Sequence, residues 1–381
     1  MIKLLVEGWR SIPHSYAVVN QFQCLEFLKR RDIKLYHRDM PKLNLNWKSE
    51  VLFDENSEHQ LKNIPDLSEK EVPNVLLRID FPHRLNPIDD AKVFVFTTSE
   101  YYRVPKASLV QDKPLKEQLN HPHVFLVTPS RWSREGILRS GVDPNKVFLI
   151  PHGVDTSLFY PLSEDERKTL RKQLAVDGFL FLNLGAMTAN KGIDTLLKAF
   201  VTIAENYPDA HLVLKGLGAL YPSSQFFQAQ AANLTPAEKK LIEPRIRYFS
   251  NTLNFKNMAY LYQALDAYVS PYTAEGFNLP VLEAIACGMP VICTEGCPTN
   301  DFTEPDFALK IASERVEAIY PDDSEGCFLS PSLDSLINQM TRVIEDADFR
   351  KRARETGPTF VINNFQWSHT VDKFIKIFRW Q

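Results

Sequence analysis

Two hydrophobic patterns alternate along the chain. Short apolar runs, which fit buried β-strands, are separated by longer segments in which apolar residues recur every three or four positions, as in amphipathic helices. The first run is Met1–Val6, and after a polar loop the first helix is expected to begin with Ser15 as its N-cap. The apolar face expected for this helix consists of Val18, Val19, Phe22, Leu25 and Leu28.

The alternation continues through both halves of the chain. In the first half, further strands are expected at Val75–Ile79, Val93–Thr97, Val124–Thr128 and Val147–Ile150. In the second half, the expected strands are Phe179–Leu184, Ala210–Leu214, Ile246–Phe249, Ala267–Ser270 and Pro290–Cys293, and the expected helices are Ile193–Asn206, Asn257–Ala264 and Leu279–Cys287. Residues 40–72 are polar, contain prolines and lack a clear period, so we expect an irregular insertion there.

Strands that alternate with helices indicate parallel sheets covered on both faces. A length of 381 residues favours two domains, and a segment with two prolines and a glycine, Ile150–Pro161, follows a strand near the middle of the chain. The pattern therefore predicts an α/β fold of two Rossmann-like, doubly wound domains, residues 1–155 and 156–365. Ligands of such sheets bind beyond the carboxyl ends of the strands, so we expect the site in a cleft between the domains.

Composition and charge narrow the function classes. No apolar run is long enough to span a bilayer, and the opening run is too short for a secretory signal, so a cytoplasmic location is expected. The net charge of −3 gives no reason to expect nucleic acid as a partner. The basic group Lys29–Arg31, with Lys34 and Arg38, is expected at the end of the first helix, where it complements the helix dipole; peripheral docking on the inner face of the membrane is the alternative.

The five cysteines are expected to be reduced thiols. Three of them, Cys287, Cys293 and Cys297, lie close together in sequence, but their spacing matches no common zinc pattern. Packing in the core is the favoured interpretation over metal binding, and no metal or other cofactor is expected.

The segment Ser270–Pro290 carries the clearest chemistry. A strand ends at Ser270, a loop contains Glu275 and Gly276, and Pro280 falls in the first turn of the following helix. The backbone N–H groups at this helix start can bind phosphate or sugar oxygens, and carboxylates on the loop and helix can accept hydrogen bonds from sugar hydroxyls. The alternative is that Glu283 only complements the helix dipole and that Glu275 is a solvated loop residue. The expected ligand-binding residues are Glu275, Gly276, Phe277, Asn278, Leu279 and Glu283.

A second loop between a strand and a helix, Asn183–Gly192, is suited to a diphosphate. Lys191 can neutralise part of its charge, and the glycines Gly185 and Gly192 allow the backbone to approach it closely.

These segments resemble a known family. Glu275–Glu283 resembles the E-x7-E motif of family 4 retaining glycosyltransferases, and Ala284–Ile292 continues that pattern. Upstream, Thr128–Val142 and Ile150–Phe159 are similar to the approach and domain crossover of the same family. The resemblance covers most of residues 124–300.

At the C-terminus, apolar residues recur at helical spacing after Ser368, which is the expected cap of a helix. The resemblance implies a GT-B architecture, in which this helix, residues 366–381, packs back on the first domain. It implies that Glu275 lies by the donor sugar and that Glu283 binds the ribose of the nucleotide. The Asn183–Gly192 segment resembles the family's phosphate-binding segment with one departure, because Ala186 stands where the family usually has arginine. Lys215 is the nearest substitute cation, and a merely solvated lysine is the alternative.

The first domain offers further candidates after its strands. Arg10 and His14 are expected to reach the donor or acceptor, against an alternative of ordinary loop polarity. Four candidates for the acceptor site are Arg78, Asp80, His83 and Glu100. The segment Glu100–Pro105 also resembles a glutamate and proline segment of some family members.

The expected activity is transfer of a sugar from a nucleotide-sugar, most simply a UDP- or GDP-sugar, to a glycan, lipid-linked, small-molecule or protein acceptor. By resemblance the reaction is a metal-independent hexosyl transfer with retention, and the catalytic candidates are Glu275, His14 and Lys191. Two alternatives stay open on the same fold: an inactive regulatory module that binds the nucleotide-sugar, and a nucleotide-sugar hydrolase or epimerase.

Overall fold

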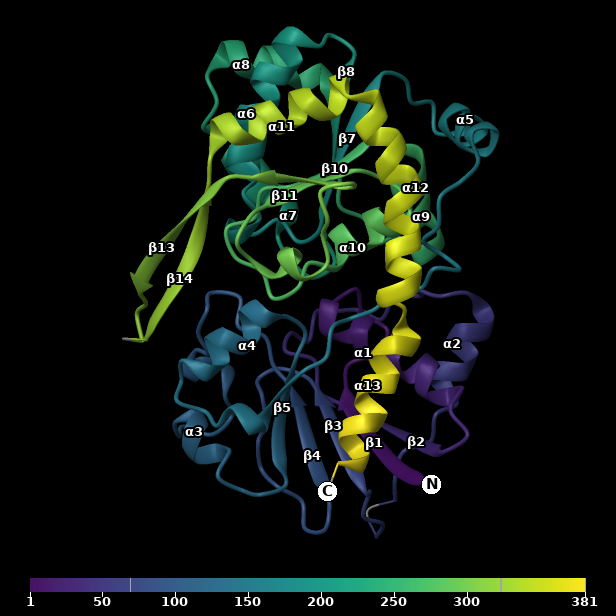
Figure 1. The fold of residues 1–381 in the computed structure, drawn as a ribbon, viewed down its shortest axis with the longest axis vertical. Coiled ribbons are helices and arrows are strands. Elements are labelled where there is room, and N and C mark those ends of the chain that lie inside the picture. The colour runs from purple at the N-terminus through teal and green to yellow at the C-terminus, as the bar shows by residue number, and fades with distance from the viewer. Residues whose placement is uncertain (69, 323, 381) are drawn as a thin grey trace. The chain divides into compact units, whose positions relative to one another are not determined.

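The computed structural model describes residues 1–68, 70–322 and 324–380. Contacts divide the chain into two compact units (Figure 1). Unit 1 consists of Met1–Gly153, Glu317–Cys327 and Phe365–Gln381, and unit 2 consists of Val154–Val316 and Phe328–Asn364.

Unit 1 is built on a parallel sheet of six strands in the order β2-β1-β3-β4-β5-β6. Its strands are β1 (Ile2–Gly8), β2 (Ile33–Asp39), β3 (Val75–Ile79), β4 (Lys92–Phe96), β5 (Val124–Thr128) and β6 (Val147–Leu149). Every residue of β3 and β5 is buried, as expected for parallel strands covered on both faces. The sequence analysis missed β2, because its charged residues interrupt the apolar run.

The helices of unit 1 are α1 (Ser15–Leu28), α2 (Glu55–Lys62), α3 (Leu115–Gln118), α4 (Arg131–Leu138) and α13 (Trp367–Arg379). Helix α2 interrupts the segment expected to be irregular, and its N-cap Asp54 accepts a hydrogen bond from the backbone N–H of Ser57. Helix α13 packs on α1, where the rings of Phe374 and Phe378 lie about 6 Å from that of Phe27. Its N-cap is Gln366, so the predicted cap at Ser368 was wrong.

Helix α1 differs from the expectation in its cap and in its buried face. Its N-cap is His14, whose Nδ1 accepts a hydrogen bond from the backbone N–H of Tyr16, and Ser15 is the first helical residue. Leu28 is 41% exposed, whereas polar side chains such as Asn20 are buried. The side-chain amide of Asn20 donates a hydrogen bond to the carbonyl of Trp9 in the loop after β1. This partner allows a polar side chain to be buried, which the hydrophobic pattern does not predict.

The predicted position of the basic group was wrong in part. Helix α1 ends at Leu28, and Lys34 and Arg38 lie on β2. Arg30 forms ion pairs with Glu26 on α1 and Asp372 on α13, so it connects these two helices.

Unit 2 contains a second parallel sheet, in the order β12-β11-β10-β7-β8-β9. Its strands are β7 (Phe179–Leu184), β8 (Ala210–Lys215), β9 (Ile246–Phe249), β10 (Ala267–Ser270), β11 (Val291–Thr294) and β12 (Ala308–Ile311). The predicted bounds of β7, β9 and β10 are confirmed. The expected α/β class, with two doubly wound sheets, is confirmed.

Helices pack on both faces of this sheet. They are α5 (Glu164–Gln173), α6 (Ile193–Asn206), α7 (Ser223–Ala232), α8 (Pro236–Ile242), α9 (Phe255–Ala264), α10 (Leu279–Ala286), α11 (Leu333–Glu345) and α12 (Ala347–Asn364). On one face, Phe181 and Leu212 of the sheet share a buried cluster with Phe200 of α6 and Met340 of α11. On the other face, the ring of Tyr268 on β10 lies 5.9 Å from that of Tyr262 on α9.

A two-stranded ribbon, β13 (Ser313–Ile319) with β14 (Glu325–Pro331), follows β12 and was not expected (Figure 1). Its outer residues, Glu317–Cys327, belong to unit 1. There the guanidinium of Arg103 lies 3.8 Å from the ring centroid of Tyr320 and forms an ion pair with Asp322. The backbone N–H of Cys327 donates to the carbonyl of Tyr101 at 3.0 Å.

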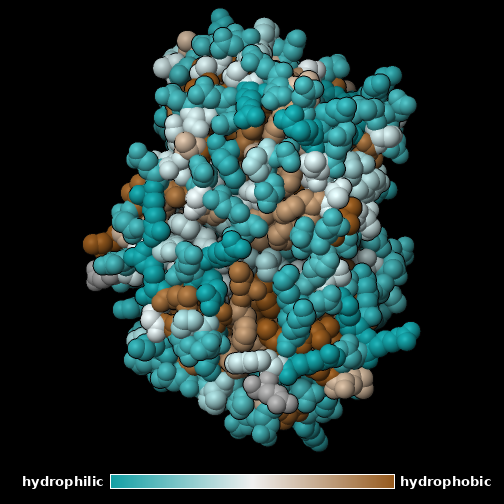
Figure 2. All heavy atoms as spheres, viewed as in Figure 1, coloured by the Kyte–Doolittle hydropathy of each residue, from teal (hydrophilic) through white to brown (hydrophobic). Residues whose placement is uncertain are grey.

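Polar side chains cover most of the face shown in Figure 2, with smaller apolar areas among them. Isolated exposed apolar residues, such as Leu45 at 97% and Ile319 at 78%, are ordinary on protein surfaces. None of the helices among the described residues has the length and hydrophobicity needed to cross a membrane.

Candidate functional site

The loops singled out in the sequence meet at the carboxyl edge of the unit 2 sheet. Strand β7 lies between β10 and β8, and these strands end at Leu184, Ser270 and Lys215. The loops that follow them therefore leave the sheet side by side, at the edge where parallel sheets bind ligands.

Two of these loops are joined by hydrogen bonds. The backbone N–H of Thr273 donates to the carbonyl of Asn190 at 2.8 Å, and the side-chain amide of Asn190 donates to the carbonyl of Ala274 at 2.9 Å. These bonds place Lys191 next to Glu275, and the Lys191 ammonium forms an ion pair with the Glu275 carboxylate. Glu275 is only 7% exposed. The structure thus brings together two residues that lie 84 positions apart in sequence.

Two glycines shape the same loops for different reasons. Gly192 has a φ of 65°, and a Cβ there would lie 2.0 Å from the carbonyl oxygen of Pro271. Only glycine fits this approach between the loops. Gly185 has a φ of 138°, and no heavy atom lies within 4 Å of the position a Cβ would take, so the backbone here borders open space.

Helix α10 begins where the sequence predicted, at Leu279 with Pro280 in its first turn. Its N-cap, Asn278, has a left-handed backbone with a φ of 77°, and its side-chain amide donates to Ser270 Oγ at 3.0 Å. The preceding Gly276–Phe277 segment is fixed by the Phe277 ring, which stacks on Phe302 at 4.7 Å. The helix N-terminus is therefore held against the end of β10 and directs its N–H groups to the carboxyl edge.

Glu283 lies on α10 and is buried. The hydroxyl of Tyr262 donates to its Oε2 at 2.8 Å, and the hydroxyl of Tyr268 donates to the carbonyl of Leu184 at 3.1 Å. Burial raises the pKa of Glu283 to about 7, and the Tyr262 hydrogen bond opposes that rise. The sequence analysis did not identify these tyrosines, because their apolar surroundings look like ordinary core.

The raised pKa of Glu283 predicts a pH-dependent stability. Between its ordinary value of 4.5 and about 7, the folded chain holds a proton that the unfolded chain has released. The free energy of unfolding therefore falls as the pH rises through this window, by on the order of 1 to 3 kcal/mol. The Glu283→Gln variant is neutral at every pH, so we expect it to be more stable than the wild type at pH 8 but not at pH 4.5.

Chemical denaturation of both proteins at several pH values measures this difference. Glu295→Gln, at an exposed position after β11, is the matched control and should follow the wild-type profile. Parallel profiles for Glu283→Gln and the wild type would contradict the expectation.

Lys215 ends β8 and is buried, with 3% of its surface exposed, so the alternative of a solvated lysine was wrong. Burial lowers the pKa of its ammonium to about 8. Its carbonyl accepts a hydrogen bond from Gly185 N–H at 3.0 Å, which places Lys215 beside the loop that carries Ala186.

Several candidates of unit 1 are engaged in ion pairs. Arg10 makes two hydrogen bonds to the carboxylate of Asp39, at 2.9 and 2.7 Å. Arg78 is buried and bonds Glu7 Oε2 at 3.1 Å, and Arg84 bonds Asp80 Oδ2 at 3.0 Å. A ligand of Arg10 or Arg78 would have to displace these partners, and their predicted contacts with donor or acceptor stay predictions.

Of the two candidate histidines of unit 1, His83 is buried and His14 is half-buried, and both are neutral at pH 7. Burial lowers the pKa of His14 to about 4 and that of His83 to about 4. The ring of Tyr16 lies between them, 5.5 Å from that of His14 and 6.3 Å from that of His83. Glu100, the fourth acceptor candidate, is exposed, and its backbone carbonyl accepts a hydrogen bond from the Trp132 indole.

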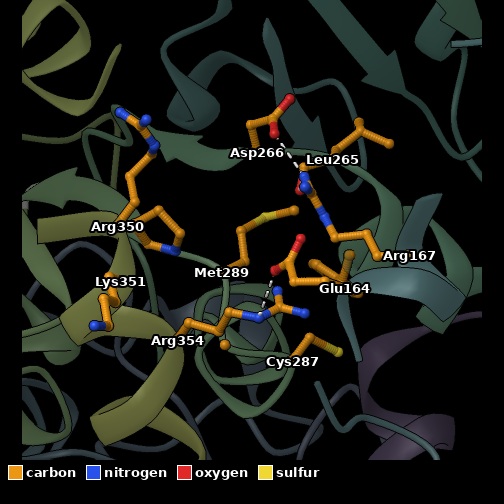
Figure 3. Close-up of a pocket in the computed structure, with 12 residues that line it drawn as sticks. Glu164, Arg167, Leu265, Asp266, Cys287, Met289, Arg350, Lys351 and Arg354 are labelled. Carbon is orange, nitrogen blue, oxygen red and sulfur yellow. Dashed lines mark hydrogen bonds and ion pairs between the residues drawn. The ribbon is translucent and has the colours of Figure 1, made fainter. Parts of the chain in front are cut away.

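A pocket of about 250 Å³ lies elsewhere in unit 2 (Figure 3). Asp266 and Pro290, which line it, directly precede β10 and β11, so it opens at the amino ends of the strands. Two of its three arginines form ion pairs, Arg167 with Asp266 and Arg354 with Glu164, and the third, Arg350, donates hydrogen bonds to backbone carbonyls. The pocket is therefore separate from the loops that carry Glu275 and Lys191.

The cysteines are all free and buried. Among residues 1–68, 70–322 and 324–380, no group of three or more histidine, cysteine, aspartate or glutamate side chains could hold a metal ion.

The sequence is similar to known proteins. The family model described as "Glycosyl transferases group 1" matches residues 165–360. O-antigen chain mannosyltransferase B of Escherichia coli is 31% identical over 221 residues, which are 56% of this chain and 54% of that protein. Mannosylfructose-phosphate synthase of Agrobacterium fabrum is 27% identical over 158 residues, 40% of this chain and 34% of that protein. The chain thus spans about a third to a half of these relatives.

A solved structure resembles the whole fold. The crystal structure of Anabaena Alr3699/HepE in complex with UDP and glucose has a TM-score of 0.71 at 13% identity, and the match covers 100% of both chains. At this identity the likeness establishes the shared fold.

Proposed function

The chain belongs to the glycosyl transferases group 1 family, and from that premise we propose that it transfers a sugar from a nucleotide-sugar donor to a hydroxyl group of an acceptor. The observation that carries the proposal is the convergence of Glu275, Lys191 and the start of α10 at the carboxyl edge of one sheet. Glu283, on the same helix, adds a second carboxylate to this edge.

The proposed roles follow from the chemistry of each group. Glu275 accepts hydrogen bonds from hydroxyls of the donor sugar, and Glu283 accepts them from the ribose. Lys191 and the N–H groups at the start of α10 stabilise the negative charge that develops on the departing diphosphate. Gly185 lets the backbone approach the phosphates, and Gly192 lets the two loops that hold Lys191 and Glu275 approach each other.

The proposed reaction retains the configuration of the anomeric carbon and uses no metal ion. The bond between the anomeric carbon and the diphosphate oxygen breaks, and the acceptor oxygen bonds to the same face of the sugar. The proton of the acceptor hydroxyl passes to the departing diphosphate. Residues of unit 1, with His14, Asp80, His83 and Glu100 as candidates, are proposed to hold the acceptor.

The donor is proposed to be a UDP- or GDP-hexose. The UDP and glucose in the HepE complex and the mannosyl group in the names of both relatives support a hexose on a nucleoside diphosphate. The acceptor is left as a glycan, lipid-linked, small-molecule or protein hydroxyl.

Calorimetric titration of the wild type with UDP, GDP and ADP tests the site. We expect saturable binding of at least one of them, and about 10-fold or greater weakening in Glu283→Gln, because an uncharged amide replaces a carboxylate that accepts hydrogen bonds from the ribose. Glu295→Gln should bind as the wild type does. Failure of the wild type to bind any of the three would refute the proposed function.

A further inference from the structure

The diphosphate of the proposed donor needs more positive charge than Lys191 alone supplies. Lys191 already forms an ion pair with Glu275. Ala186, in the loop after β7, offers no side-chain donor to the phosphates. A nucleoside diphosphate carries at least two negative charges, so a second cation at this edge would account for its binding.

The register of the sheet places the Lys215 side chain on the face of the site. Lys215 lies beside Leu184 of β7, and Tyr268 of β10 lies beside Leu182. Side chains two residues apart on a strand share a face, so Lys215, Leu184 and Tyr268 all lie on one face. This is the face on which Tyr268 contacts Tyr262 of α9, the residue that donates a hydrogen bond to Glu283. The opposite face holds the apolar cluster with α6.

The loops next to Lys215 are fixed to one another. Ser223 Oγ accepts hydrogen bonds from the backbone N–H of Met187, at 3.3 Å, and of Leu217, at 3.1 Å. It therefore joins the loop after β7 to the loop after β8. A Cβ on Gly216 would lie 2.7 Å from the hydroxyl of Tyr248. The backbone around Lys215 is thus held closely, while the space beside Gly185 is open.

Lys215 itself has no counter-charge among the described residues. Its ammonium makes no hydrogen bond or ion pair there, although 97% of the residue is buried. Burying an ammonium without a partner costs free energy, and burial is the cause that lowers its pKa. An apolar residue at this position would stabilise the fold better than an unpaired ammonium does. A buried, unpaired ammonium is therefore typical of a site that binds an anion.

We propose that Lys215 binds the diphosphate of the donor and replaces the cation that Ala186 does not provide. This inference rests on the proposed function. The ammonium of Lys215, at the end of β8, and that of Lys191, in the loop after β7, would then both approach the diphosphate, and Gly185 would let the backbone come close to it. The diphosphate would supply the counter-charge of Lys215.

The test is titration of Lys215→Met with UDP and GDP and with their nucleosides, uridine and guanosine. Methionine keeps much of the length and volume of the buried stem but removes the charge. We expect the diphosphate that binds the wild type to bind the variant about 10- to 100-fold more weakly, because a charged hydrogen bond is lost, while any nucleoside affinity is unchanged. Lys198→Met, at an exposed position on α6, is the control and should bind as the wild type does.

A second variant separates a binding role from a structural one. Ala186→Arg in the Lys215→Met background returns a cation to the site from the adjacent loop, and we expect it to recover at least part of the lost affinity. If Lys215→Met binds the diphosphate as tightly as the wild type, the role of Lys215 is refuted while the proposed function stands. If Lys215→Met loses affinity for the diphosphate and for the nucleoside equally, and adding Ala186→Arg recovers none of that affinity, Lys215 has only a structural role. If the wild type binds none of UDP, GDP and ADP, both proposals fail.

Discussion

Replacing Glu275 with glutamine is expected to lower kcat by about 100- to 1000-fold, the range seen when a group that stabilises the transition state is removed. The side chain is buried at the carboxyl edge and forms an ion pair with Lys191. Glutamine keeps the shape and one acceptor oxygen but loses the charge and the second acceptor oxygen, so the hydroxyls of the donor sugar lose a charged acceptor and Lys191 loses its ion-pair partner. Glu275→Ala should be at least as impaired. Release of nucleoside diphosphate at saturating donor measures the rate.

Two comparisons make this result specific. Glu295 directly follows the neighbouring strand β11 but is exposed, so Glu295→Gln should keep the wild-type rate. Binding of the nucleoside diphosphate should change far less than kcat in Glu275→Gln, because the proposed partner of this carboxylate is the sugar. A variant that retains more than half of the wild-type kcat would remove Glu275 from the proposed mechanism.

Replacing Glu7 with alanine is expected to destabilise unit 1 by about 3 to 5 kcal/mol, as for other buried ion pairs that lose one partner. Glu7 Oε2 accepts from Arg78 Nε at 3.1 Å and from Arg84 Nη2 at 3.1 Å, and Glu7 Oε1 lies 3.4 Å from Arg38. The side chain of Arg78 is only 3% exposed, so without Glu7 its charge is buried with carbonyl oxygens as its remaining acceptors. Thermal and chemical unfolding measure the loss.

The control is Glu71→Ala, which removes an exposed ion pair with Lys3. It should change the free energy of unfolding by less than about 1 kcal/mol, because solvent screens such pairs. Equal effects of the two substitutions would show that the buried network around Arg78 does not stabilise the fold as described.

Much of unit 2 was predictable because its strands are apolar runs with clear ends. The bounds of β7, β9, β10 and α6 were predicted as the structure has them. By contrast, β2 was missed, because charged residues interrupt its apolar run, and the partners of Arg38, which are Glu7 on β1 and Asp66, lie in other segments that a local pattern cannot show. The region after β11 gave no prediction of the β13–β14 ribbon, whose outer residues contact a distant part of the sequence.

The candidate site was predictable as a set of loops but not as a geometry. The loop after β7 and the loop after β10 were both identified, yet the ion pair between Lys191 and Glu275 depends on the order of strands in the sheet. The same limit applies to Arg78, which the sequence offers as a free cation but which pairs with Glu7 because β3 lies beside β1. The burial of Lys215, at the end of β8, is likewise not visible in a local pattern.

Incubation of the wild-type protein with a panel of UDP-, GDP- and ADP-sugars, with and without cell extract as a source of acceptor, tests the central claim most directly. We expect that one donor is cleaved to its nucleoside diphosphate, that extract increases the rate of cleavage, and that the sugar is recovered on an acceptor. Cleavage that extract does not increase would indicate a hydrolase. Saturable nucleotide binding without cleavage of any donor would contradict the account and indicate a binding module that does not turn over.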